Sequence, residues 1–153
     1  EFWPCMTRIS RDNARTPMQW DDSEQAGFTA GKPWMPVNPN YREINAKAAL
    51  EDRHSVFYHY QKLIALRKQY PVIVHGDYEL LFEDSEEVFA YKRSLGKEKL
   101  LVVCSFVDKE TAFTLPEAFT GGNCLISNYE NPGKEGVLRP YEAFAVLIDG
   151  IGG

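Results

Sequence analysis

Cysteine is scarce in this chain, and positive charge is not in excess. The 153 residues include three cysteines, Cys5, Cys104 and Cys124, without a C-x-x-C spacing. An odd number in this arrangement argues against a disulfide framework or a zinc site and favours the reducing cytoplasm. The net charge is −5, so the chain lacks the basic surface that attracts nucleic acids and anionic membranes. We therefore expect neither of them as a partner.

Long apolar runs and the common catalytic motifs are also missing. No stretch reaches the length of a transmembrane helix, and the first residues do not have the pattern of a signal peptide. There is no phosphate-binding loop, no G-x-G-x-x-G and no G-x-S-x-G. The histidines lack the H-E-x-x-H spacing, and a calcium loop starting at Asp22 would fail at Ala26. We expect no cofactor and no metal.

A polar segment near the start, RDNARTPMQW at residues 11–20, is the most distinctive part of the sequence. Arg11 and Arg15 flank Asp12, and a forked guanidinium suits either a carboxylate or neighbouring hydroxyl groups. Residues 11–41 show little hydrophobic periodicity and are interrupted by glycine and proline. A loop of this length is usually functional or packs against something outside the chain. The residues alone also allow a plain loop whose charges satisfy one another.

Two helices are predicted after this loop. Asn45 can cap a short helix through Leu50, and Asp52 or Ser55 can cap a second helix that runs to about Tyr70, before a proline. Apolar residues recur at helical spacing along one face of the second helix, namely Val56, Phe57, Tyr60, Leu63 and Ile64.

The remainder of the chain changes to the period of a strand. Short strands are predicted at residues 78–82, 88–94, 100–106, 112–115, 124–127, 137–138 and 143–148. Several short strands with turns between them predict an antiparallel β-sandwich. Cys104 falls in the most apolar of these strands, so we expect it to be a small core residue.

The string RDNARTPMQWDD, followed by Gly27-Phe28, Trp34 and VNPNY at residues 37–41, resembles bacterial α-glucosidases of the α-amylase superfamily, glycoside hydrolase family 13. This group includes oligo-1,6-glucosidase, dextran glucosidase, trehalose-6-phosphate hydrolase and sucrose isomerase. The resemblance extends from about Ser10 to Ile148. It implies a mainly β chain in which a Greek-key C-terminal β-sandwich, of the α-amylase domain C type, follows the end of a truncated (β/α)₈ barrel.

The resemblance also implies the domain boundaries. Residues 1–9 do not resemble the family well, so we expect them to be a divergent or cloning-derived segment. Residues 10–72 are a remnant of the catalytic barrel, consisting of the loop after the eighth strand and the eighth helix. Residues 73–153 form the C-terminal β-sandwich domain. In such a chain the missing N-terminal barrel is the partner, and oligosaccharide binds only in the full-length parent enzyme.

The site residues follow from the same resemblance. In this family an Asp nucleophile, a Glu acid/base and an assisting Asp come from earlier barrel strands, and none has a matching motif here, so no catalytic residue is expected. Arg11 matches the arginine that hydrogen-bonds the terminal glucose at the base of the pocket. Asp12, Asn13 and Arg15 are expected to support the loop. The large aromatic residues expected to pack against the missing barrel rather than stack on sugar are Trp20, Phe28 and Trp34.

Three hypotheses follow for the chain itself. The first is a structural accessory module of an intracellular α-glucosidase, inactive alone. The second is an autonomous carbohydrate-binding module, which needs exposed aromatic side chains on one face of the sandwich. The third is a fragment that associates with itself through an exposed helix face carrying Val56, Phe57 and Tyr60.

Overall fold

The computed structural model describes residues 11–133 and 136–149. The segment predicted at residues 1–9 therefore lies outside the described residues. Within the described ranges, no helix is both long enough and apolar enough to cross a membrane.

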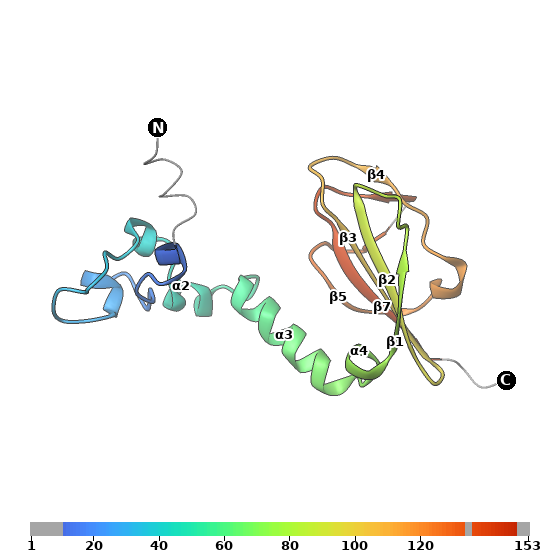
Figure 1. Cartoon of the computed structure of the whole chain (residues 1–153), viewed down its shortest axis with the longest axis horizontal. Helices are drawn as coiled ribbons and strands as arrows, with labels where there is room; N and C mark the ends of the chain where they lie inside the picture. Colours follow the sequence, from blue (N-terminus) through green and yellow to red (C-terminus); the bar gives the residue numbers. More distant parts are fainter. Residues whose placement is uncertain (1–10, 134–135, 150–153) are drawn as a thin grey trace. The chain divides into compact units, whose positions relative to one another are not determined.

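The chain divides into two compact units, Glu1–Gln61 and Lys62–Gly153. Helix α3 (Val56–Gln69) runs across the boundary between them (Figure 1). This division reflects only the contacts that the residues of this chain make with one another. The predicted domain boundary between residues 72 and 73 is based on the fold of a complete barrel, so it stays a prediction.

The long loop of the first unit contains three helical turns of the 3-10 type. They are η1 (Arg11–Ala14), η2 (Glu24–Gly27) and η3 (Pro39–Arg42). Hydrophobic periodicity cannot reveal an element of one turn, which is why the sequence predicted only a loop. The backbone of η2 is left-handed, with φ of 55° at Gln25 and Ala26 and 65° at Gly27.

Helix α2 (Ala46–Glu51) starts at its predicted cap. The side-chain oxygen of Asn45 accepts a hydrogen bond from the backbone N–H of Ala48 at 2.8 Å. This bond satisfies one of the N–H groups that the first turn of a helix leaves without a partner. The predicted cap is confirmed, and the helix extends just past Leu50.

Helix α3 begins directly after Ser55, whose carbonyl accepts from the N–H of His59 at 3.1 Å. None of its 14 residues is buried. A further short helix, α4 (Val72–His75), follows Pro71 and was not predicted from the sequence. Proline is tolerated at a helix start because the N–H that it lacks would have no partner there. The Pro71 carbonyl accepts from the N–H of His75 at 2.8 Å.

The second unit is an antiparallel β-sandwich, as predicted. One layer has five strands in the order β1-β2-β3-β7-β5, and the other pairs β4 with β6. The strands are β1 Asp77–Leu81, β2 Val88–Leu95, β3 Glu98–Ser105, β4 Thr111–Ala112, β5 Asn123–Ser127, β6 Val137–Leu138 and β7 Ala143–Asp149. At one edge of the larger sheet, β5 carries a bulge between Cys124 and Ile126.

The strand predicted at residues 112–115 is too long, because β4 ends at Ala112. Phe113 has left the strand and is only 5% exposed. Its ring fills the core, while its N–H donates to the carbonyl of Gly136 at 2.9 Å. The predicted strand was too long because Phe113 is apolar for its place in the core and not for a place in the strand.

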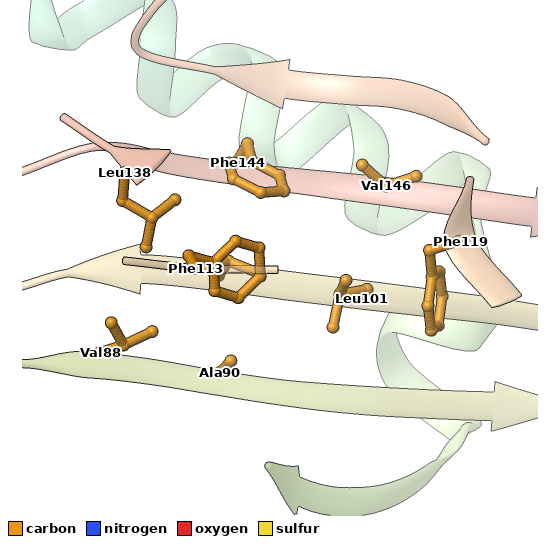
Figure 2. Close-up of a cluster of buried hydrophobic side chains, with 9 residues drawn as sticks. Val88, Ala90, Leu101, Phe113, Phe119, Leu138, Phe144 and Val146 are labelled. Atoms are coloured by element: carbon orange, nitrogen blue, oxygen red, sulfur yellow. The ribbon is translucent and has the colours of Figure 1, made fainter. Parts of the chain in front are cut away.

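The main core lies between the two layers (Figure 2). The larger sheet contributes alternate residues of three strands, namely Val88, Ala90, Leu101, Val103, Phe144 and Val146. The smaller layer and its connections contribute Phe113, Phe119 and Leu138. The rings of Phe113 and Phe144 meet edge to face with their centres 6.2 Å apart, an arrangement that adds to the stabilisation from burial alone.

The outer face of the larger sheet is covered in part by α4. Val72 of α4 is fully buried in a cluster that includes Leu100 and Leu147. Arg93 holds α4 in place, because its guanidinium donates to the carbonyl of Gly76, just after α4, at 2.7 and 3.2 Å. The end of the segment before β1 is therefore fixed on this outer face.

Cys104 does not belong to the main core. Its register places it opposite Phe89, on the outer face of the sheet, where it is half-buried. Burial raises the pKa of its thiol, which disfavours the reactive thiolate form at neutral pH.

Candidate functional site

The predicted site residues lie together at the start of the described chain. Arg11, Asp12 and Asn13 are in η1, and Arg15 follows it, with its backbone N–H donating to the carbonyl of Asp12 at 3.0 Å. The side chains of Arg11, Asp12 and Arg15 are exposed. An exposed guanidinium can present its forked donors to a pair of hydroxyl groups or to a carboxylate.

The residues after the arginines are fastened to the start of α2 by the backbone. The carbonyl of Gln19 accepts from the N–H of Ala46 at 2.9 Å, and the carbonyl of Trp20 accepts from the N–H of Lys47 at 3.0 Å. These N–H groups belong to the first helical turn, which has no partners for them within the helix. The loop thus supplies hydrogen-bond acceptors to the first turn of α2, and these bonds in turn fix the position of the loop.

Side chains strengthen this attachment. The Gln19 amide donates to the side-chain oxygen of Asn40 at 3.1 Å and also to the carbonyl of Ile44. Asn45 is buried, and its amide donates to the carbonyl of Tyr41 at 2.8 Å. Sequence reasoning found the cap at Asn45 but missed Gln19, because the partners of Gln19 are more than 20 residues away along the chain.

A closed turn follows Trp20. The carboxylate of Asp21 accepts from the backbone N–H of Ser23 at 2.9 Å and from its hydroxyl, and these bonds lower the pKa of Asp21. Gly27, with φ of +65°, passes so close that an added Cβ would lie 2.8 Å from an Asp21 carboxylate oxygen. Only glycine fits this position without strain. The Asp-x-Ser pattern is a recognisable turn signal, although the sequence prediction did not use it.

A shallow depression of about 420 Å³ lies beside the motif. Its lining is mostly apolar and comes from the motif itself, the start of α2 and Phe57, with Pro17, Met18 and Ile44 among the contributors. Such a lining suits apolar protein side chains better than a sugar, which needs several placed polar groups. The aromatic residues expected to pack outside the chain are exposed by 53% at Trp20, 43% at Phe28 and 76% at Trp34.

Several carboxyl groups of the described residues are engaged in ion pairs. Among the described residues, each ion pair joins one carboxylate to one cation, as in Lys109–Glu87 and Arg139–Glu142. In the described ranges, no group of three or more His, Cys, Asp or Glu side chains could hold a metal ion. The exposed guanidinium groups of this arrangement can bind hydroxyl or carboxylate groups.

The chain belongs to the α-amylase family of glycoside hydrolases, family 13. Residues 2–76 match the family described as "Alpha amylase, catalytic domain". The matched part includes the loop, α2, α3 and α4, and it ends just before β1. It also includes most of residues 1–9, the segment expected to be divergent or cloning-derived.

Among its relatives are enzymes of known activity. The chain is 57% identical over 139 residues to oligo-1,6-glucosidase from Parageobacillus thermoglucosidasius. The matched segment covers 87% of this chain and 25% of that enzyme. The crystal structure of trehalose-6-phosphate hydrolase from Bacillus licheniformis matches with a TM-score of 0.84 and 48% identity, covering 92% of this chain and 26% of that one. Isomaltulose synthase from a Klebsiella species matches with a TM-score of 0.83 and 39% identity, covering 91% and 26%.

These comparisons confirm the resemblance predicted from the RDNART motif. The chain spans about a quarter of the length of these relatives. The mainly β architecture, with its antiparallel sandwich, matches the solved structures of the family.

Proposed function

We propose that this chain is the C-terminal part of a cytoplasmic α-glucosidase, and that alone it is a structural accessory module without catalytic acids. The observation that carries this proposal is its similarity, at 57% identity, to only 25% of an oligo-1,6-glucosidase. The complete parent would hydrolyse α-1,6- or related α-glucosidic bonds in short oligosaccharides. The free thiols Cys104 and Cys124 support a reducing location.

The division into domains belongs to the same proposal. Residues 10–72 would be the last loop and helix of the catalytic barrel, and residues 73–153 the C-terminal sandwich. Two observations support this division. The catalytic-domain match ends at residue 76, and α3 has no buried residue in this chain, as expected for a helix whose cover lies on the missing barrel.

Arg11 is proposed to bind the terminal glucose in the parent enzyme, with Asp12, Asn13 and Arg15 supporting the loop. The exposed guanidinium in η1 and the attachment of the following residues to α2 support this assignment. A loop fastened in this way positions a side chain more exactly than a free one. The missing barrel would supply the acids, and Arg11 would supply the hydrogen bonds that close the end of the pocket.

The activity of the chain alone tests the proposal. We expect no turnover of nitrophenyl α-glucoside or isomaltose by the purified chain. Turnover that survives purification and is lost in Arg11→Ala would contradict the proposal.

A chimera tests the role of Arg11. It joins the part of the Parageobacillus thermoglucosidasius oligo-1,6-glucosidase that precedes the matched segment to this chain. We expect the chimera to hydrolyse isomaltose, and Arg11→Ala to lower its kcat/KM about 30-fold, as the loss of a charged hydrogen bond to a sugar would. Arg42→Ala, an exposed arginine in η3, is the matched control and should change kcat/KM little. Equal effects of the two substitutions would remove Arg11 from the site.

A further inference from the structure

The turn between β1 and β2 carries an aromatic residue in a strained backbone conformation. Phe82, the residue after β1, has φ of +56°. This left-handed region is an outlier for a bulky aromatic residue, and such outliers gather at functional sites. The carbonyl of Phe82 accepts from the N–H of Ser85 at 2.9 Å, and the hydroxyl oxygen of Ser85 accepts from the N–H of Val88 at 3.0 Å. These bonds hold the turn, so the turn sets the direction of the Phe82 side chain.

The Phe82 ring belongs to the wall of a hollow of about 390 Å³ in the sandwich unit. The lining comes from the β1–β2 turn, the start of β2, β4 and the residues after β4. Val88 and Phe113 connect this hollow to the main core (Figure 2). A pocket of this volume can hold a small ligand. We call it the turn pocket, and its aromatic and polar lining residues are Phe82, Ser85, Glu87, Thr111, Phe113 and Thr114.

Glu87 gives the turn pocket a carboxylate that is held in place. One of its oxygens accepts from the Thr111 hydroxyl at 3.3 Å, and the other pairs with the Lys109 ammonium at 2.5 Å. The contact with Lys109 lowers the pKa of Glu87, so the group is ionised at neutral pH. A carboxylate has about four acceptor positions, and these two contacts leave room for hydroxyl groups of a ligand.

The Phe82 ring is supported from within the sandwich and is also open to solvent. It meets the ring of the buried Phe113 with the ring centres 5.7 Å apart, yet its side of the pair is 46% exposed. Hydroxyl groups line the same pocket. The Ser85 oxygen accepts from two backbone N–H groups, which leaves its own proton to donate, and Thr114 is exposed. The turn pocket thus combines an aromatic face, hydroxyl groups and an oriented carboxylate.

This combination suits a sugar ring. A pyranose has an apolar face of C–H groups for an aromatic ring and hydroxyl groups around its edge for donors and acceptors. An anionic ligand fits poorly, because ionised Glu87 would repel it and Lys109 already has a partner. A cation is the alternative, because the turn also carries Glu83, Asp84 and Glu86, but none of these three lines the turn pocket.

We propose that the turn pocket binds a glucose ring of a short oligosaccharide, with the Phe82 ring stacked on it and the Glu87 carboxylate accepting hydrogen bonds from its hydroxyl groups. The choice of glucose rests on the proposed function, in which the parent acts on α-glucosidic bonds, whereas the fit to a pyranose rests on the pocket itself. The sandwich would then bind sugar by itself, which differs from the expectation that oligosaccharide binds only in the full-length parent.

Titration of the isotope-labelled chain with isomaltotriose, followed by backbone N–H signals in NMR spectra, tests the proposal directly. We expect the signals of residues 82–88 and 111–114 to move and those around Tyr141 to stay. Mannitol is the matched ligand control, because it offers hydroxyl groups without a ring. Unmoved signals of the turn pocket, shifts confined to η1, or equal shifts with mannitol would overturn the proposal. Binding of spermine in place of the sugar would overturn it in favour of a cation site.

Substitution of Phe82 tests the aromatic contact. Phe82→Gly removes the ring and suits the left-handed backbone, so the variant should fold and bind isomaltotriose about 10-fold more weakly. Tyr141→Gly is the matched control, because Tyr141 is also aromatic, has φ of +53° and is 55% exposed, but does not line the turn pocket. It should leave the affinity unchanged. Equal affinities of the two variants would overturn the role of Phe82.

Substitution of Glu87 tests the polar contact and keeps the shape of the pocket. Glu87→Gln should weaken binding about 10-fold, because hydrogen bonds to a charged acceptor are stronger than those to a neutral one. Glu79→Gln is the matched control, since Glu79 also pairs with a lysine, Lys92, but does not line the turn pocket. A chain that binds equally well with either substitution would contradict the proposed role of Glu87.

Turnover separates this inference from the proposed function. A chain that binds isomaltotriose in the turn pocket, with a chimera that does not hydrolyse isomaltose, would contradict the proposed function and support the sugar site. An active chimera, with a chain whose turn pocket does not respond to the sugar, would overturn the sugar site and leave the proposed function in place.

Discussion

Glu142 is a carboxylate without solvent exposure, and it holds the loop before β7. Its oxygens accept from the Arg139 guanidinium at 2.9 Å and from the backbone N–H groups of Arg139 and Gly133, both at 2.8 Å. The Arg139 guanidinium also lies over the ring of Tyr129, 4.2 Å from its centre. Burial opposes the ionisation of Glu142, but the hydrogen bonds outweigh it, so the pKa of this carboxyl is lowered.

We expect Glu142→Gln to lower the free energy of unfolding by about 3 kcal/mol at pH 7, because it leaves Arg139 without its charged partner. The folded-state pKa of Glu142 lies below its ordinary value of 4.5, so the stabilisation is present above that value. It is lost as the pH falls through the folded-state pKa. Urea unfolding at pH 7 and at lower pH should therefore show the difference between the two proteins shrinking in acid.

The control for this substitution is Glu79→Gln. Glu79 pairs with Lys92 at 2.6 Å, but its side chain is 57% exposed, and exposed pairs contribute little. An equal loss of stability in both variants at pH 7 would contradict the special role of Glu142.

Single residues also show what the sequence can predict. Asn45 was predicted as a cap because its role depends on a residue three positions away. Gln19 was not, because it meets Asn40 and Ile44 through the fold. The role proposed for Arg11 rests on family resemblance alone, since a guanidinium in a loop has no local pattern that indicates a sugar.

At the scale of elements, α3 has an apolar side that the described chain leaves uncovered. Val56 is 81% exposed, Tyr60 65% and Phe57 44%. We expect the isolated chain to associate with itself at high concentration through this side. Val56→Glu/Tyr60→Glu should restore the monomer, as measured by sedimentation velocity, because the added charges repel one another and resist burial.

Exposed positions elsewhere on the same helix supply the control. Lys62→Glu/Gln69→Glu adds negative charge on the side of α3 away from Val56, Phe57 and Tyr60 and should leave association unchanged. If the unsubstituted chain remains a monomer at high concentration, self-association through the apolar side of α3 is ruled out.

Most elements could be predicted because they are long enough for their hydrophobic periodicity to be recognised in the sequence. The strands β2 and β3 are eight residues long, and β3 contains an unbroken apolar run from Leu100 to Cys104. Helix α3 is 14 residues long, and its apolar residues recur at helical spacing. Elements of about one turn, such as α4 and the 3-10 helices, are too short to show a period. Their position depends on contacts with distant residues, for example Arg93 with Gly76.

At the scale of the whole molecule, the two compact units differ in how much they bury. Nearly all buried apolar side chains of the described residues lie at or after Val72, and Pro17 and Ala26 are the exceptions. A unit that buries little apolar surface opens easily. We therefore expect limited proteolysis to cut before residue 62 first and to leave a fragment containing β1 to β7, identified by mass spectrometry. Early cuts inside the strands would contradict this order of stability.

The bulge in β5 has a consequence for the sandwich as an isolated protein. Because β5 is an edge strand, its outer backbone groups are a template on which a strand of another molecule can form a ladder. The irregular register between Cys124 and Ile126 breaks that template. Fibril growth by strand addition is thus hindered along this margin, so we expect concentrated solutions of the sandwich not to seed amyloid from β5.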